Sequence, residues 1–238
     1  MLFSPTRRVA FAHYPKTAGT SLTNWFLAAF PDAVPVCAGF PHTPVRRGLE
    51  LLGVCRTPTR GASWLLRLPF RTGAESAVSV HPPACIIGVI REPFEMLVSL
   101  YEYWRRQPGP TRSSFIRSAQ QGSFSEFLTV GFRRRKIIAY EHFFDVDGPV
   151  WPQTRLVTFD ALQPGLLEVC RELGITTPPQ LKRANAAARY QRTLDDYAAE
   201  AGPLVDRVRT HFAWYYEQGV NLAIRGSTGT VSAMRSAA

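Results

Sequence analysis

A continuous apolar run at residues 84–90, A-C-I-I-G-V-I, places the strongest constraint on the fold. A strand with no charged residue on either face must be covered on both sides, which is typical of the centre of a parallel sheet. A polar turn follows at residues 91–93, and helical periodicity resumes at residues 94–104. An earlier, largely apolar run at residues 8–14 also precedes a polar loop and a helical pattern. This repeated order of strand, loop and helix predicts an α/β fold with a mostly parallel sheet flanked by helices.

The limits of the first strand and helix are marked by residues that stop or start regular structure. Pro15 ends the first strand because it lacks a backbone N–H donor. Thr20 or Ser21 is expected as the N-cap of the helix, since a hydroxyl oxygen can accept from the first helical N–H groups. The apolar spacing of L-T-N-W-F-L-A-A-F then continues until Pro31. These signals give a strand, a short polar loop and a helix in succession.

The C-terminal half continues the alternation of strands and helices. Residues 154–159 are expected to form a third strand, and Asp160 is expected to cap the helix that follows. That helix covers residues 162–173 and ends at Gly174, a residue type common just past helix ends. Residues 195–218 are interpreted as one further helix with aromatic side chains crowded near its end. Strands and helices therefore alternate over most of the chain.

The length of 238 residues favours a single domain, which we expect over residues 1–225. The tail at residues 226–238 is small and polar, and this composition predicts disorder. The stretch from residue 31 to about residue 81 is rich in Pro, Gly and Arg. It is expected to form short helices and loops that cover one side of a ligand site. Parallel sheets bind ligands beyond the carboxyl ends of their strands.

The overall composition points to an anionic partner. The chain has 28 Lys and Arg against 18 Asp and Glu, a formal charge of +10, which suits a nucleotide, a nucleic acid or an acidic glycan. The four cysteines are scattered without metal-ligand spacing, so neither a zinc site nor a dense disulfide framework is expected. The first residues lack the pattern of a secretory signal, and the chain has no run of about 20 apolar residues. We therefore expect a soluble, cytoplasmic protein without a bound metal.

The nonapeptide H-Y-P-K-T-A-G-T-S at residues 13–21 lies between the first strand and the first helix. Backbone N–H groups and the positive end of a helix can surround an anion at such a junction. Lys16 adds a point charge, and Gly19 lets the main chain come close to a ligand. The loop therefore has the chemistry of a phosphate or sulfate cradle. The residues expected to hold the anion are Lys16, Thr17, Ala18, Gly19, Thr20 and Ser21.

The cradle differs from a Walker A loop, because G-x-x-x-x-G-K-[ST] is absent and the lysine precedes the glycine. It resembles the 5′-phosphosulfate loop of the sulfotransferases, which reads H-I-P-K-T-A-G-T-S in the carbohydrate-modifying and related bacterial branches. Tyr14 is the one departure from that form. The resemblance implies a P-loop-like central sheet and the donor 3′-phosphoadenosine-5′-phosphosulfate (PAPS). It also implies transfer of a sulfuryl group to a hydroxyl of a carbohydrate or a related small acceptor.

A second segment, R-E-P-F-E-M-L-V-S-L-Y from Arg91, is similar to the family signature R-D-P-x-x-R-x-x-S-x-Y. The resemblance implies that Arg91 and Ser99 hold the 3′-phosphate of the donor. An arginine at the end of a strand can fork onto a phosphate, and a serine about two helical turns later can reach the same anion. Met96 replaces the second arginine of the signature. The role of that arginine is therefore either lost here or supplied by another residue, such as Arg105 or Arg106.

Sulfuryl transfer needs a base for the acceptor proton and a cation near the departing oxygen. Lys16 is expected in the second role. His42 is the preferred base, because its surroundings resemble a histidine segment found between the two signatures in several relatives. His81, which enters the second central strand, is the other candidate, and Glu75 is a weaker one. His13 is interpreted as a packed strand residue.

Two other functions stay open on the sequence alone. One is a nucleotide phosphotransferase with an unusual loop, and the other is a nucleic-acid-binding protein without enzymatic activity, suggested by the charge of +10. The sulfotransferase is the preferred interpretation because it accounts for both anion-binding segments together. Neither the acceptor nor the oligomeric state follows from the sequence.

Overall fold

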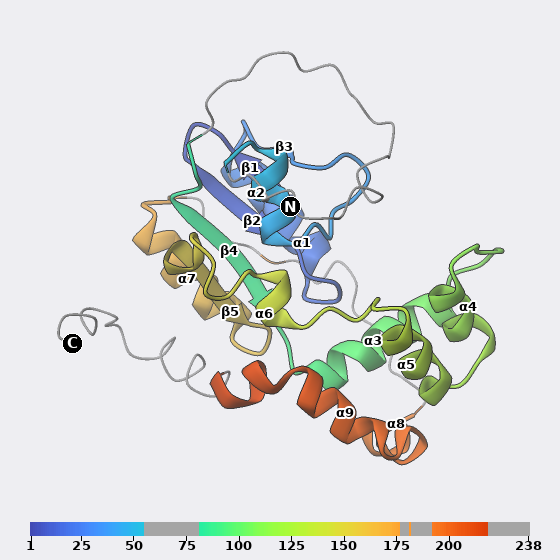
Figure 1. Cartoon of the computed structure of the whole chain (residues 1–238). Coiled ribbons are helices and arrows are strands. Elements are labelled where there is room, and N and C mark those ends of the chain that lie inside the picture. The colour runs from blue at the N-terminus through green and yellow to red at the C-terminus, as the bar shows by residue number, and fades with distance from the viewer. Residues whose placement is uncertain (55–80, 177–180, 182–191, 219–238) are drawn as a thin grey trace.

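The computed structural model describes residues 1–54, 81–176, 181 and 192–218 of the chain. Its centre is a five-stranded mixed sheet with the order β3-β1-β2-β4-β5 (Figure 1). β2, β4 and β5 run parallel, whereas β1 pairs antiparallel with both β2 and β3. The α/β class is thus confirmed, with parallel pairing confined to three strands. The strands are β1 (Leu2–Ser4), β2 (Val9–Ala12), β3 (Val34–Pro35), β4 (Cys85–Ile90) and β5 (Thr154–Thr158).

Helices cover both faces of the sheet and gather beyond one end of it (Figure 1). One face packs against α1 (Gly19–Ala29) and α7 (Leu162–Glu172), and the other against α2 (Val45–Leu51) and α6 (Tyr140–Phe143). The chain leaves the carboxyl end of β4 directly into the remaining helical part. Its helices are α3 (Pro93–Arg105), α4 (Ser114–Gln121), α5 (Phe124–Arg133), α8 (Leu194–Ala201) and α9 (Leu204–His211).

The central strands are buried on both faces, as their apolar sequences predict. All six residues of β4 are buried. Ile87 belongs to the core on the α1 side, where Phe11 of β2 also packs against Phe26 of α1 with ring centroids 6.0 Å apart. Ile86 and Ile90 belong to the core on the opposite face. Alternate residues of one strand therefore face the two cores, as the pleat of a strand requires.

Helix α1 begins earlier than the sequence signals indicate. Its N-cap is Ala18, with φ of 60° and ψ of 21°, and the helix starts at Gly19. The expected caps Thr20 and Ser21 instead lie in the first turn. Their placement brings the positive end of the helix dipole directly against the loop.

Two further boundaries differ from expectation. Asp160 is not the cap of α7, because Ala161 occupies the N-cap position. The single helix expected at residues 195–218 is divided into α8, α9 and a further helical stretch at residues 213–218. Gly202, with φ of 53°, and Pro203 separate α8 from α9. A left-handed glycine followed by a residue without an N–H donor ends a helix.

The N-terminal strand β1 and its neighbour β3 do not appear among the sequence expectations. They have three and two residues, too short for a pattern of alternation to be read. Within the Pro-, Gly- and Arg-rich stretch, the structure describes β3 and α2. Residues 55–80, which include Glu75, and the tail at residues 226–238 lie outside the described residues.

Gly88 in the middle of β4 leaves room for side chains from two other elements. A Cβ built at this position would fall inside van der Waals contact of Phe144 and Leu156. We expect Gly88→Ala to lower the free energy of unfolding by about 1–3 kcal/mol through overpacking. Urea denaturation followed by circular dichroism measures the change. An unchanged denaturation midpoint would show that this core accommodates the added methyl group without loss of stability.

Candidate functional site

The pairing of β2 with β4 decides where the two polar segments meet. Ala12 lies opposite Gly88 in the parallel register, so both strands end at the same edge of the sheet. The loop of residues 13–18 leaves β2 at that edge, and Arg91 follows the last residue of β4 there. The two segments that the sequence singles out therefore lie at neighbouring carboxyl ends. This is the edge at which open α/β sheets bind ligands.

The loop has a strained backbone that is closed by an internal hydrogen bond. Lys16 and Ala18 have φ of 62° and 60°, in the left-handed region that non-glycine residues seldom adopt. Such a conformation costs about 1–2 kcal/mol for each residue. The buried Thr17 hydroxyl donates to the carbonyl oxygen of Tyr14 at 2.8 Å and holds the turn. Strain maintained by surrounding contacts is frequent at functional sites.

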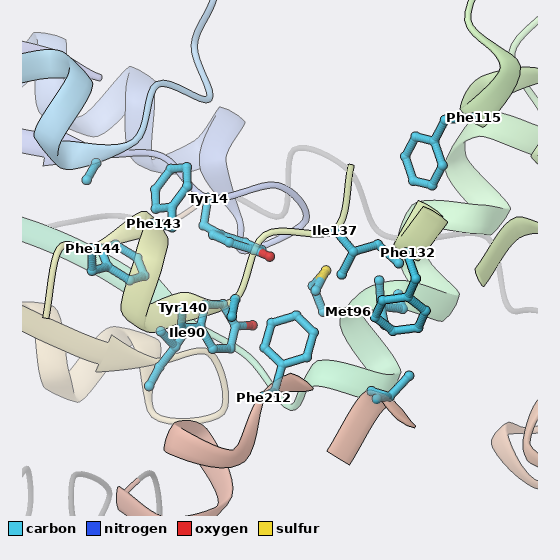
Figure 2. Close-up of a cluster of buried hydrophobic side chains, with 14 of the residues drawn as sticks. Tyr14, Ile90, Met96, Phe115, Phe132, Ile137, Tyr140, Phe143, Phe144 and Phe212 are labelled. Carbon is cyan, nitrogen blue, oxygen red and sulfur yellow. The ribbon is translucent and has the colours of Figure 1, made fainter. Parts of the chain in front are cut away.

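Tyr14, the one departure from the family loop, anchors the loop to the segment before α6. Its hydroxyl donates to the carbonyl oxygen of Ile138 at 2.5 Å. Its ring packs edge-on against Tyr140 at 4.7 Å and Phe143 at 4.8 Å between ring centroids (Figure 2). Burial raises the pKa of Tyr14 well above its ordinary value, so the hydroxyl keeps its proton for this bond. An isoleucine, which stands at this position in the loop that the sequence resembles, could not make this hydrogen bond.

Arg91 is fixed through its backbone and is only partly satisfied in its side chain. Its N–H donates to the Tyr140 hydroxyl at 3.2 Å, and that hydroxyl donates to the Arg91 carbonyl at 2.7 Å. The guanidinium lies over the Phe159 ring at 4.6 Å and pairs with Glu95 at 3.2 Å. The buried Nε has no hydrogen-bond partner among the described residues. An orphan donor of this kind fits an anionic ligand, because burying an unpaired polar group is costly.

Three cations converge at this edge. The pKa of Lys16 is lowered, first by burial and then by the charges of Arg91 and Arg106. Arg106 donates through Nε to the carbonyl oxygen of Glu102 at 2.9 Å, which holds it at the end of α3. Arg105 pairs with the Glu102 carboxylate at 3.0 Å. Of the two arginines expected to replace the missing family cation, Arg106 is the one whose charge acts on Lys16.

The departure at Met96 has a structural reason. Met96 is 1% exposed and lies in the core near Ile137 and Phe212 (Figure 2). Ser99 lies between Glu95 and Tyr103, which are one turn before and one turn after it on the helix. Glu95 contacts Arg91 and Tyr103 contacts Lys16. Ser99 therefore lies between the two residues of α3 that contact Arg91 and Lys16, and it is itself 6% exposed.

Two histidines lie together beside the loop. Nδ1 of His42 is 3.1 Å from the carbonyl oxygen of His13, and the two ring centroids are 4.4 Å apart. The His13 ring also stacks on Phe11 and occupies the space that a Cβ on Gly19 would fill. Gly19 therefore makes room for the His13 ring. The role expected for Gly19 from the sequence is different, namely to let a ligand come close to the main chain. The sequence identifies His42 as a candidate. Its contact with His13 depends on tertiary packing, which a local sequence pattern does not predict.

The electrostatics of the pair favour neutral imidazoles. Burial, together with the neighbouring His42, lowers the pKa of His13 to about 3. Burial also lowers the pKa of His42, and the nearby Lys16 acts in the same direction. Because a carbonyl oxygen can only accept, Nδ1 of His42 is the protonated nitrogen in its contact with His13. Nε2 of His42 then carries the lone pair and can accept a proton.

The second base candidate, His81, lies at the wrong edge of the sheet. It precedes β4, whereas Lys16 and Arg91 follow the carboxyl ends of β2 and β4. Pro82, next to it, accepts two hydrogen bonds from the Arg8 guanidinium at the start of β2. The six residues of β4 separate His81 from the loop. His81 as the catalytic base is therefore incompatible with this geometry.

Other features of the described residues lie away from this edge or are absent. One cavity, of about 360 Å³, is lined by Arg7, Asp32 and neighbouring residues, and another, of about 290 Å³, by Arg8, Pro82 and neighbours. Both lie toward the amino ends of the central strands. Within the part of the chain that the structure describes, no group of three or more His, Cys, Asp or Glu side chains is arranged to hold a metal. No helix there has the length and apolar character needed to cross a membrane.

Comparisons of the chain with protein-family models, curated proteins and solved structures give no match.

The low pKa of His13 predicts a dependence of stability on pH. An unfolded histidine binds a proton below about pH 6.5, whereas folded His13 stays neutral down to about pH 3. The free energy of unfolding therefore decreases as the pH falls below 6.5, by up to about 2 kcal/mol at pH 5. His13→Asn is expected to flatten the stability curve between pH 7 and pH 4, measured by urea unfolding. His142→Asn, a change at an exposed histidine, should retain the wild-type slope, and an equal slope in all three proteins would contradict the burial of neutral His13.

Proposed function

We propose that this protein is a sulfotransferase that moves a sulfuryl group from PAPS to a hydroxyl of a carbohydrate or a related small acceptor. The observation that carries the proposal is the meeting of the Lys16 loop and Arg91 at the carboxyl ends of adjacent parallel strands. In this proposal the sheet is a P-loop-like scaffold. Its two anion-binding segments hold opposite ends of one bis-anionic nucleotide.

The charges at this edge suit a ligand with two anionic groups. None of the ion pairs between described residues includes Lys16. The mutual repulsion of Lys16, Arg91 and Arg106 is relieved when anions lie between them. The backbone amides at the start of α1 and Lys16 would hold the phosphosulfate end of the donor. Arg91 and Ser99 would hold the 3′-phosphate. The Nε of Arg91 has no hydrogen-bond partner among the described residues.

The chain supplies the groups that sulfuryl transfer needs. The acceptor oxygen attacks sulfur, a new S–O bond forms, and the bond from sulfur to the oxygen of the 5′-phosphate breaks. Nε2 of His42 takes the acceptor proton, since Nδ1 is engaged by the His13 carbonyl. The Lys16 ammonium faces the oxygen on which negative charge develops. His13 acts on the reaction indirectly, by orienting His42.

Donor binding is the first test of the proposal. Isothermal calorimetry should show saturable binding of 3′-phosphoadenosine-5′-phosphate without added divalent metal. Arg91→Ala should weaken this binding about 10- to 100-fold, because a charge-assisted contact is lost. Arg155→Ala, which removes an arginine paired with Glu172 at 2.9 Å on β5, should bind like the wild type. An absence of any affinity for the nucleotide would end the sulfotransferase proposal, and magnesium-dependent ATP turnover would favour a phosphotransferase.

Turnover separates the roles of Lys16 and His42 from simple binding. With radiolabelled donor and a panel of glycans, glycolipids and phenolic metabolites, His42→Ala should lower kcat about 10²- to 10⁴-fold. Lys16→Ala should lower kcat about 10²- to 10³-fold and reduce nucleotide affinity much less. His142→Ala, at an exposed histidine, is the matched control and should keep wild-type turnover. A Lys16 variant that loses affinity alone would make Lys16 an anchor without a role at the departing oxygen.

A further inference from the structure

One face of α3 lies along the loop and carries residues at helical spacing. Glu95, Ser99 and Tyr103 are four residues apart, so their side chains follow one another on a single face. Glu95 reaches Arg91, and the Tyr103 ring lies 4.4 Å from Nζ of Lys16. Tyr103 is 40% exposed, whereas Ser99, one turn earlier, is 6% exposed. An aromatic ring on the partly exposed face of α3 therefore meets the loop lysine directly.

Lys16 is in an environment that opposes its charge. The groups that face it are Arg91 after β4, Arg106 at the end of α3, and His42 before α2. Both arginines repel the ammonium, and partial burial removes water from it. Nζ of Lys16 lies over the face of the Tyr103 ring, and the negative face of an aromatic ring attracts a cation. This contact favours the charged lysine where the other neighbours disfavour it.

We propose that Tyr103 is a positioning residue for Lys16, holding the ammonium between the loop and α3 in the charged form that an anion needs. The neighbouring Trp104 ring packs edge-on against Tyr103, with 4.9 Å between the ring centroids. The identity of the anion rests on the proposed function, whereas the state of Lys16 does not. No residue in the sulfotransferase signatures quoted above corresponds to this role.

The chain offers a direct measurement, because it contains three lysines, Lys16, Lys136 and Lys182. Competitive labelling with limiting acetic anhydride at a series of pH values, read by mass spectrometry, gives the titration of each amine. Exposed Lys136 serves as the internal reference. Tyr103→Leu keeps the bulk of the side chain and removes the ring, so the proton affinity of Lys16 should fall about two- to fivefold. Tyr103→Phe keeps the ring and should titrate like the wild type.

Tyr101→Phe is the matched control on the same helix. It removes a hydroxyl that donates to the Gly122 carbonyl at 3.0 Å in the core and leaves Lys16 untouched. Thermal unfolding of each variant identifies general loss of structure. If folded Tyr103→Leu and wild-type protein give the same Lys16 titration, the proposal is overturned.

Nucleotide binding provides the second readout. Affinity for 3′-phosphoadenosine-5′-phosphate should fall about two- to fivefold in Tyr103→Leu and recover in Tyr103→Phe, with the loss setting in at lower pH than in the wild type. If wild-type protein does not bind this nucleotide, the proposed function fails while the labelling result still decides the role of Tyr103. If it binds and Tyr103→Leu binds equally well at every pH, Tyr103 does not position Lys16.

Discussion

The parallel hydrogen bonding between β2 and β4 is the constraint on which the candidate site depends. Because Ala12 and Gly88 are opposite each other, the chain leaves both strands at one edge of the sheet. The two polar segments that follow the strands therefore lie next to each other. An antiparallel pairing of the same strands would have placed the loop and Arg91 at opposite edges. Both strands are covered on two faces, so a one-residue slip of register would exchange the side chains that pack in the two cores. The position of the site is therefore fixed by the core.

A second layer of support comes from Tyr140, which joins the two segments through one side chain. Its hydroxyl exchanges hydrogen bonds with the backbone N–H and carbonyl of Arg91, and its ring packs on Tyr14 of the loop. The same ring contacts Phe212 at 5.2 Å between centroids, beyond the end of α9 (Figure 2). Burial raises the pKa of Tyr140 far above its ordinary range, so this hydroxyl donates at any working pH. A displacement of Arg91 would therefore be transmitted to the loop through a packed aromatic contact.

The sequence predicts those parts of the fold whose physical cause is local. The run at residues 84–90 indicates burial on both faces, and β4 is indeed central. By contrast, β1 is three residues long and pairs with the edge of β2. Nothing in the local sequence of β1 predicts this pairing. The local signals misplace the start of α1, because its N-cap is an alanine in a left-handed conformation. Alanine is disfavoured as an N-cap residue. His13 and His42 are 29 positions apart, and only tertiary packing makes them neighbours.

The grouping of Lys16, Arg91 and Arg106 is a cost that folding alone does not explain. Burial lowers the pKa of Lys16, and the like charges of Arg91 and Arg106 lower it further. Both arginines have carboxylate partners on α3, Glu95 for Arg91 and Glu102 for Arg106, whereas none of the ion pairs between described residues includes Lys16. An anion beside the Lys16 ammonium would supply a neutralising charge at this position. An anion that binds only the folded chain stabilises it more the tighter it binds, so binding of the proposed bis-anionic donor would offset the electrostatic cost of this grouping.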